Sequence, residues 1–577
     1  MKKIFLFACI FAATGSMVSC IDDDNNYNYE NINEIKGGIN NFNNMKSSYS
    51  VAVGQELTLS PTFEYTIDKE NPDVTFEWTI NAEKVEGATA QTHTFVFDKS
   101  GAYEVSFYVI DNKTGIKYGR SATVTVMAEY QRGWVILSKD ENGKSVLNFI
   151  TPSSMQYTLQ YNGKDLTRDS VIYTDCKRNL NPNLPTNPKK MFLAVGNCDY
   201  YGYYGVSVYD EIVIQGDQWE ELDGNNLEHA SYTLDEFGDG QQPEGIKLAE
   251  GSFTFSMKAL RDENGYIYCN VKPDAADFHA GRYTPVPINN GMKFKRLFEY
   301  RKFDGPNDKT MIALTEDNSL VAICDGGVPM SFRQLSTINE SSRVRSSNVY
   351  DLTPSPSTYP GLSFNKMKDE IVDVRQIVKA SSSSGRDITT SIPSYIALSR
   401  DPKTNQCSLF SFEIDAPYNN MQKIVRVEEY YKRPFGTINN YKDMAVFYFK
   451  NYVIIADGNK LYYCQYGKNR DTKVEMLGER QLIKTFDSDI VSLDVQDIAL
   501  YLKTAMYDYP GQLGVALENG EFFIFSINEQ KDEDGNCLKA TMNQLFPNEF
   551  VKDNKFGNIV DVLYKGGKSF GYFSFGF

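Results

Sequence analysis

Seven copies of one short pattern occupy the chain from residue 129 to residue 577. Each copy is an apolar run of strand length, a polar turn and a second apolar run, which is the pattern of a β-hairpin. The starts lie mostly about 60 residues apart, at Trp134, Met191, Phe253, Met311, Tyr395, Tyr452 and Leu513. A repeated hairpin buries its faces only by stacking on its neighbours. The pattern therefore predicts an all-β region, a seven-bladed β-propeller over residues 129–577.

The turns of four copies support the hairpin interpretation. They contain Asn142-Gly143, Asn264-Gly265, Asp457-Gly458 and Asn519-Gly520, residue pairs that tolerate the positive φ of tight hairpin turns. A ring of blades needs a closing strand, and we expect the last segment, 570–577, to pair near Trp134. Two consecutive β-sandwich domains are the alternative, against which the even spacing weighs. Little helix is expected, because no stretch keeps a 3.6-residue apolar period for long.

A separate β region precedes the repeat at residues 34–128. Its apolar and polar residues alternate between Gly, Asn and Asp turns, and Trp78 is placed to fill the space between two sheets. Tyr103 stands where a tyrosine corner would tie a strand to the preceding turn. The run Gly101-Ala102-Tyr103-Glu104-Val105, followed by Val109-Ile110-Asp111, resembles the repeat signature of PKD domains. This resemblance implies an immunoglobulin-like β-sandwich that serves as a spacer or adhesive module and carries no catalytic residue.

The first nineteen residues have the composition of a secretory leader. Lys2 and Lys3 precede a short apolar run, and small residues lead to Val18-Ser19-Cys20. This sequence resembles the lipobox of bacterial lipoproteins, in which cleavage leaves the acylated cysteine as the new N-terminus. The resemblance implies that residues 1–19 are a signal peptide and that Cys20 carries the lipid. A plain secretory leader with an incidental cysteine is the alternative.

Residues 20–33 form an acidic segment after that cysteine. The run Asp22-Asp23-Asp24 resembles the signal that sends lipoproteins of Bacteroidetes to the outer face of the outer membrane. A solvated tether would look the same. We expect a lipid-anchored protein of the outer membrane, exposed at the cell surface. No later segment reaches the roughly 18 apolar residues of a membrane-spanning helix, so acyl chains are the only attachment predicted.

Charge and cysteine usage exclude several kinds of partner and cofactor. The net charge of −16 argues against nucleic acid as a partner. The three histidines lie far apart without metal-ligand spacing, and C-x-x-C is absent, so neither a metal site nor a cofactor is predicted. Cysteines inside apolar runs are expected to be buried thiols outside any disulfide, at Cys269, Cys324, Cys407 and Cys464.

Aromatic residues are the best candidates for contact with a ligand. Four tyrosines in DYYGYYG and a tryptophan between acidic residues are placed for exposure, where rings stack on sugars or peptide side chains: Tyr200, Tyr201, Tyr203, Tyr204 and Trp219. Filling the core of the blades is the alternative for each ring. The motif H-E-x-x-H, the P-loop and the dinucleotide fingerprint are absent from the sequence. We therefore assign no catalytic residue and favour a non-enzymatic role.

Lipobox, acidic tether, PKD-like sandwich and long β region together resemble the PKD-like family of Bacteroidetes lipoproteins. The resemblance implies a surface lipoprotein that assists a TonB-dependent transporter and its substrate-binding lipoprotein in the uptake of a glycan or peptide. A non-catalytic accessory or ligand-binding protein is thus the first hypothesis. A surface glycoside hydrolase or lyase with its site on the propeller face is the second, and an adhesive or structural protein the third. Carboxylates clustered with aromatic rings at the propeller mouth would favour the second.

Overall fold

A computed structural model divides the chain into two compact units. Unit 1 comprises residues 1–97 and 103–125, and unit 2 comprises residues 98–102 and 126–577. The structure describes residues 33–38, 40–67, 69, 72–130, 132–161, 164–181, 183–196, 209–238, 242–254, 257–271, 282–300, 310–325, 347–377, 394–415, 425–447, 451–466, 479–496, 511–566, 569–570 and 573–574.

Unit 1 is a β-sandwich. One sheet has the order β1(Ser48–Ala52), β7(Lys117–Met127), β6(Gly101–Asp111), β3(Val74–Ile80), β4(Glu83–Lys84), and the other pairs β2(Glu56–Leu59) with β5(His93–Val96). Trp78 fills the space between the sheets, as predicted. Its ring is fully buried 4.7 Å from Phe107 and 5.3 Å from Phe95, and its Nε1 donates to the Ala90 carbonyl. The tyrosine-corner hydrogen bond stays a prediction, although the Tyr103 ring packs 4.8 Å from Phe97.

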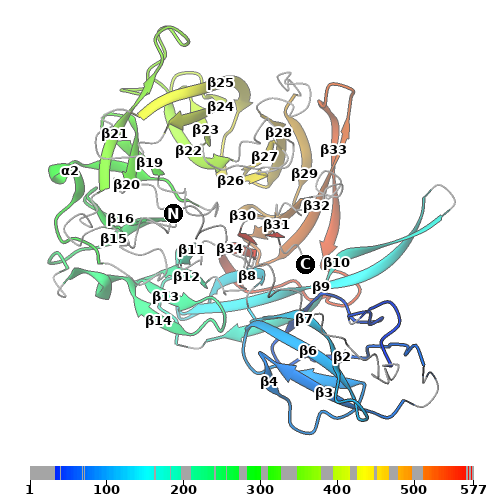
Figure 1. Cartoon of the computed structure of the whole chain (residues 1–577). Coiled ribbons are helices and arrows are strands. Elements are labelled where there is room, and N and C mark those ends of the chain that lie inside the picture. Colours follow the sequence, from blue (N-terminus) through cyan, green and yellow to red (C-terminus); the bar gives the residue numbers. More distant parts are fainter. Residues whose placement is uncertain are drawn as a thin grey trace, which may run out of the picture. The chain divides into compact units, whose positions relative to one another are not determined.

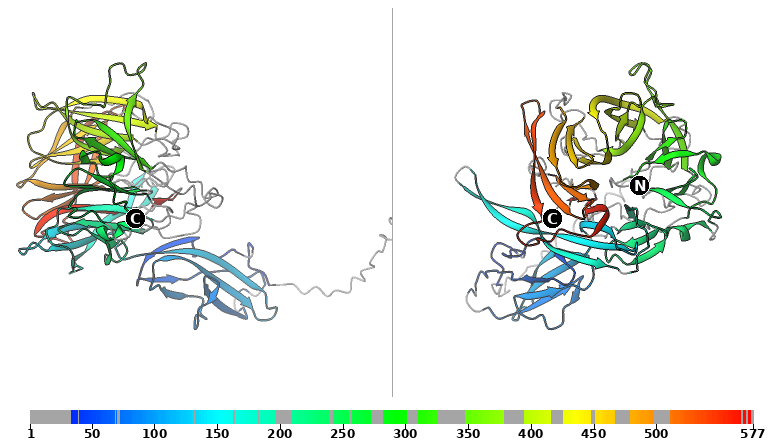
Figure 2. Two further views of the ribbon diagram at one scale, coloured as in Figure 1. Left: turned by 90° about the vertical axis from the view of Figure 1, so that its left-hand side faces the viewer. Right: turned by 180° about the vertical axis from the view of Figure 1, so that it is seen from behind.

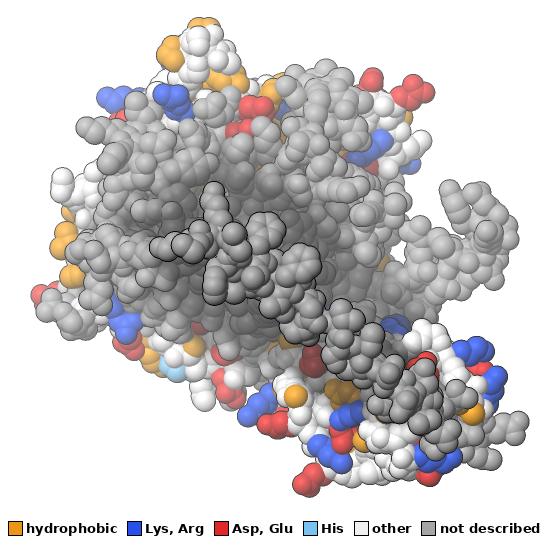
Figure 3. Space-filling model, viewed as in Figure 1, with side chains coloured by type: hydrophobic (Ala, Val, Ile, Leu, Met, Phe, Trp, Pro, Cys, Tyr) orange, Lys and Arg blue, Asp and Glu red, His pale blue; other side chains and the backbone are white. Residues whose placement is uncertain are grey.

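Charged side chains of both signs are interspersed on the surface of unit 1 (Figure 3). Several form exposed ion pairs, such as Lys36 with Glu64 at 2.9 Å. Exposed pairs of this kind contribute little to stability.

Unit 2 is a seven-bladed β-propeller (Figures 1 and 2). The blades, innermost strand first, are β34(Asn558–Gly566)–β8(Arg132–Lys139)–β9(Ser145–Tyr161)–β10(Lys164–Leu180); β11(Lys190–Gly196)–β12(Tyr209–Gln215)–β13(Glu220–Asp223)–β14(His229–Tyr232); β15(Leu248–Phe253)–β16(Met257–Asp262)–β17(Ile267–Val271); β18(Phe294–Leu297)–β19(Thr310–Thr315)–β20(Leu320–Asp325)–β21(Ser347–Pro354); β22(Glu370–Ile377)–β23(Ser394–Arg400)–β24(Gln406–Asp415)–β25(Val425–Thr437); β26(Tyr441–Phe447)–β27(Tyr452–Asp457)–β28(Lys460–Gln465)–β29(Gln481–Thr485); and β30(Ile490–Gln496)–β31(Gln512–Leu517)–β32(Phe522–Lys531)–β33(Cys537–Phe546). We number them 1 to 7 in this order.

The seven predicted hairpins each supply neighbouring strands of one blade. Six of the seven form the second and third strands, although in blade 3 the predicted start, Phe253, is the last residue of β15. In blade 2 the copy forms the first two strands. The predicted turn glycines Gly143, Gly265, Gly458 and Gly520 all have positive φ. The propeller prediction is therefore confirmed, and the alternative of two sandwiches is wrong.

The ring closes through a different segment from the one expected. β34 pairs antiparallel with β8 and places Tyr564 opposite Trp134, whereas the described part of the final segment forms only the two-stranded pair β35(Ser569–Phe570) and β36(Phe573–Ser574). β34 offers nine residues for the ladder and buries Val562 and Leu563. The Phe-rich end of the chain is more apolar, but the prediction overlooked the longer alternating run before it.

The cores of unit 2 lie between neighbouring blades. At the junction of blades 7 and 1, Trp134 packs 5.0 Å from Tyr564 and 5.8 Å from Phe522. Gly514 permits this contact, because a Cβ atom there would lie 2.3 Å from the Trp134 ring. Blades 4 and 5 are further joined by parallel pairing of β21 with β25, which makes one eight-stranded sheet.

Helix is scarce, as predicted. Within the described residues the helices are η1(Thr233–Glu236) and α2(Ile288–Gly291), and none of them is long and apolar enough to cross a membrane. Cys269, Cys324, Cys407 and Cys464 are buried and outside disulfides, which confirms the prediction for these four thiols.

Candidate functional site at the propeller axis

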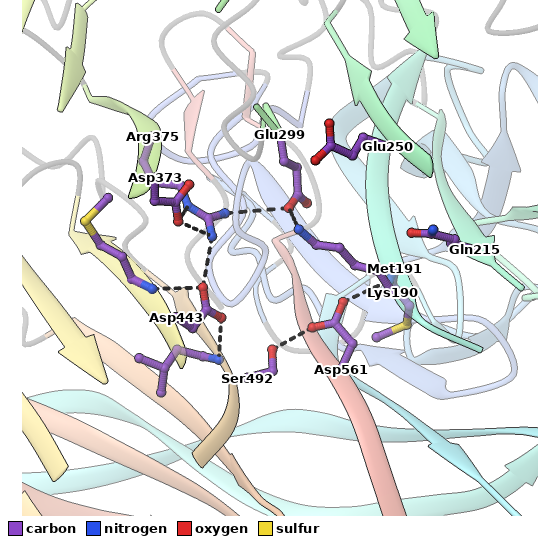
Figure 4. A network of polar contacts seen from close by, with 12 residues as sticks. Lys190, Met191, Gln215, Glu250, Glu299, Asp373, Arg375, Asp443, Ser492 and Asp561 are labelled. Carbon is purple, nitrogen blue, oxygen red and sulfur yellow. Dashed lines mark hydrogen bonds and ion pairs between the residues drawn. The ribbon is translucent and has the colours of Figure 1, made fainter. Parts of the chain in front are cut away.

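Six of the seven innermost strands share one irregularity. In each, the pairing with the second strand shifts by one residue near the start of the strand, as in a β-bulge. The residues immediately after the shift are Glu250, Arg296, Asp373, Asp443, Ser492 and Asp561. A bulge bends the strand and re-aims a side chain. The six residues, together with Lys190, Glu299 and Arg375, form what we call the axial network. Figure 4 labels all of them except Arg296.

Aspartates of the network connect the innermost strands of adjacent blades. Asp443 accepts a hydrogen bond from its own neighbour Met444 N (2.8 Å) with one oxygen and from Leu493 N of blade 7 (2.8 Å) with the other. Asp561 does the same with Val562 N (3.0 Å) and with Met191 N of blade 2 (2.8 Å). A carboxylate that accepts two buried backbone N–H groups satisfies donors that the blade ladders leave open.

Other junctions between blades are also joined by hydrogen bonds from a side chain of one blade to the backbone of the next. Glu250 accepts from Leu297 N (2.6 Å) between blades 3 and 4, and Asp494 accepts from Tyr564 N (2.6 Å) between blades 7 and 1. Between blades 2 and 3, the Gln215 amide donates to the Ala249 carbonyl at 3.0 Å.

Arg375 links three blades. Its guanidinium donates to Asp373 Oδ2 (3.0 Å) on its own strand and to Asp443 Oδ1 (2.9 Å) in blade 6, and lies 3.6 Å from Glu299 Oε2 in blade 4. Glu299 in turn forms a 2.6 Å ion pair with Lys190 in blade 2. Figure 4 shows these side chains pointing toward one another from strands far apart in the sequence. Polar contacts thus join every pair of neighbouring blades.

The groups around Asp373 keep its carboxyl group ionised. Burial alone would raise its pKa, but the Arg375 guanidinium and the Tyr441 hydroxyl, which donates at 2.6 Å, hold the pKa below its usual value. Tyr441 is correspondingly hard to ionise, because burial and the charges of Asp373 and Asp443 raise the pKa of its phenol well above 10.

This arrangement suits cohesion better than catalysis. Acid–base hydrolysis by two carboxyl groups needs one of them protonated near neutral pH, which requires a raised pKa. Asp373 is held ionised, and Asp443 and Asp561 are engaged by backbone N–H groups on two strands. Across the described ranges, no three His, Cys, Asp or Glu side chains are grouped as metal ligands.

The predicted ligand-binding residues do not belong to this network. Trp219 is only 3% exposed and stacks on Phe192 at 5.4 Å, so the expectation of an exposed ring is wrong. Its acidic neighbours Glu220 and Glu221 misled the prediction, because both are buried with partners, His229 and Lys258. Outside the described residues lie Tyr200, Tyr201, Tyr203, Tyr204, Cys20, Asp22, Asp23 and Asp24.

The sequence analysis did not single out the axial network, although a signal exists. The tetrapeptide Ile-Val-Asp-Val occurs at 371–374 and again at 559–562, at the same place in two innermost strands. A search for a second repeat, in register with the hairpins, would have found Asp373 and Asp561.

Comparison with known families identifies the N-terminal region. Residues 20–175 match the PKD-like family. The N-terminal region of this chain is PKD-like. The match covers the sandwich of unit 1 and continues into the first hairpin of the propeller. No match was found among curated proteins.

The chain is similar to several solved structures, each at low sequence identity. A quinonprotein alcohol dehydrogenase-like protein from Bacteroides thetaiotaomicron is 11% identical, with 93% of this chain and 100% of that chain covered and a TM-score of 0.32. Prp20p from Saccharomyces cerevisiae is 10% identical (62% and 86% covered, TM-score 0.31). The β-propeller domain of Cps50 (Swd1) from Myceliophteria thermophila is 11% identical (69% and 97% covered, TM-score 0.31). The blade order described above rests on the strand pairing of this chain itself.

Proposed function

We propose that the protein is a non-catalytic accessory or ligand-binding component of an outer-membrane complex that takes up a glycan or peptide. The observation that carries the proposal is the use of the axial carboxylates. They bind backbone N–H groups and cations of neighbouring blades, as Asp443 does with Leu493 and Arg375. A propeller whose axial charges are paired between neighbouring blades is a rigid scaffold that presents its loops to a partner.

The proposed location and partner rest on sequence resemblance. Cys20 would carry the lipid anchor in the outer membrane, and Asp22, Asp23 and Asp24 would direct the protein to the cell surface. The PKD-like match of residues 20–175 supports the same kind of protein. The proposed partners are a TonB-dependent transporter and its substrate-binding lipoprotein. The tyrosines at 200–204 remain the proposed ligand contacts.

Co-purification tests this proposal. The tagged, lipidated protein is solubilised from native outer membranes in mild detergent and captured, and the bound proteins are identified by mass spectrometry. We expect a TonB-dependent transporter and its lipoprotein in the capture. A Cys20→Ser variant, which lacks the lipid acceptor, controls for capture that does not depend on the membrane. Recovery of the protein alone, with turnover of glycans in an activity screen, would favour the surface hydrolase instead.

A further inference from the structure

A second polar cluster lies buried between blades 2 and 3, away from the axial network. The Lys258 ammonium on β16 is fully buried and donates to Glu221 Oε2 at 3.1 Å and to Glu236 at 2.9 and 2.7 Å. Glu221 lies on β13 and Glu236 on η1, so both carboxylates reach Lys258 from blade 2. Because the Lys258 amine has no access to solvent, it can react only with groups that are buried beside it.

Asn270 is such a group. It stands directly opposite Lys258 in the β16–β17 ladder, so the two side chains share a face and their Cβ atoms lie about 5 Å apart. Asn270 is fully buried, and within the described part of the chain neither its Oδ1 nor its Nδ2 has a hydrogen-bond partner. An orphaned buried carboxamide is costly and calls for a chemical explanation.

Large apolar side chains surround the pair. Leu260 and Tyr268 flank Lys258 and Asn270 on the same face, and Phe237 and Tyr283 pack over that face. Tyr283 is fully buried, and burial together with Glu236 and Glu221 raises the pKa of its phenol well above 10. In a medium without competing water, a carboxamide next to an amine is protected from hydrolysis and open to aminolysis.

The carboxylates next to Lys258 can move its proton. Burial alone would lower the pKa of the ammonium, but Glu221 and Glu236 offset this and raise it, so the charged form predominates. The reactive neutral amine forms when the proton passes to Glu236, 2.7 Å away. A reaction that happens once in the life of each molecule needs only a small population of that form.

We propose that Lys258 and Asn270 form an intramolecular isopeptide bond. The Lys258 Nζ attacks the Asn270 Cγ, a new C–N bond forms, and the old bond from Cγ to Nδ2 breaks. The carboxyl group that accepted the lysine proton returns it to the departing nitrogen, so an ammonium and a carboxamide become an amide and an ammonium ion. No oxidant, metal or cofactor takes part. The product removes a buried ammonium and an orphaned carboxamide together.

Peptide mapping of the folded full-length protein tests the bond. Acylated Lys258 resists trypsin, and trypsin does not cleave the Lys272-Pro273 bond, so we expect peptide 248–261 joined to peptide 262–282, with a mass about 17 Da below the sum of the two because ammonia is lost. Unlinked peptides ending at Lys258 as the sole product would overturn the proposal. A loss of about 18 Da, that of water, would place the bond on a glutamate and would also overturn it.

Variants give a second, independent result. Lys258→Arg and Asn270→Leu are each expected to abolish the linked peptide. Lys565→Arg is the matched control, since Lys565 is equally buried but donates to the Tyr130 and Gly224 carbonyls. The linked peptide must persist in Lys565→Arg. The mass of the linked peptide is measured on the wild-type protein, so the proposal can be tested even if a variant fails to fold.

Discussion

Single aspartates at the axis perform a task that strand pairing cannot. In the described part of the chain, the innermost strands of neighbouring blades do not pair with each other, and the bulge interrupts the regular pairing near the start of the strand. Asp443 and Asp561 each accept one N–H from their own strand and one from the next blade. Each carboxylate therefore satisfies buried donors and fixes the position of one blade against another.

Replacing Asp443 with asparagine should destabilise unit 2. The amide loses the charge and directs N–H hydrogens at Leu493 N or Met444 N, so we expect Asp443→Asn to lower the free energy of unfolding by about 2 kcal/mol. Chemical denaturation measures the change. Glu141→Gln, at an exposed turn position, is the control and should change it by less than about 0.5 kcal/mol. Equal effects of the two substitutions would refute the structural role.

The lowered pKa of Asp373 predicts that the free energy of unfolding depends on pH in the acid range. Its pKa in the folded protein lies below the ordinary value of about 3.9, so its ionised form adds stability that is fully present above pH about 4. That contribution is lost as the pH falls through the folded pKa. Asp373→Asn should be less stable than wild type at pH 7 and should lose stability less steeply below pH about 4. The measurement is denaturation across pH, with exposed Asp487→Asn expected to keep the wild-type slope.

At the scale of strands, β34 controls the integrity of the ring. It pairs with β8 along its length and also holds Asp561, which accepts a hydrogen bond from Met191 N in blade 2. Its buried residues Ile559, Val562 and Leu563 each contribute about 1.5–3 kcal/mol of apolar burial.

Two truncations separate the closing strand from the segment after it. Deletion of residues 567–577 leaves β34 intact and should change the melting temperature of unit 2 by only a few degrees. Deletion of 558–577 removes β34 and should lower it by more than about 10 °C. Differential scanning calorimetry distinguishes them. A large loss in the shorter deletion would show that the final segment, not β34, closes the ring.

The sequence predicted the blades better than their centre. The hairpins of each blade were found because they join alternating apolar strands through glycine turns such as Asn142-Gly143. Innermost strands were missed because they are short or carry charge, as in β18, Phe294–Leu297, with the sequence FKRL. The contacts of the axial network could not be predicted even though its aspartates carry a sequence signal, because Arg375 meets Asp443 and Lys190 meets Glu299 only after the ring has closed.

At the scale of the whole molecule, many of the buried charges of unit 2 hold the blades together. The axial network joins seven blades, and the Lys258 cluster is sealed between two of them. Under the proposed function, this cohesive molecule, with its PKD-like N-terminal region, is a scaffold that works with partners. The proposed uptake role therefore depends on a stable complex more than on any one side chain.

The size of the native particle shows whether such a complex forms. The untagged protein is solubilised from its own outer membrane in mild detergent, and its mass is measured by light scattering after separation. We expect most of the protein to run in a particle far larger than the 65.4 kDa of the full chain, together with a transporter and its lipoprotein. A particle that holds one copy of the chain and detergent alone would contradict this expectation.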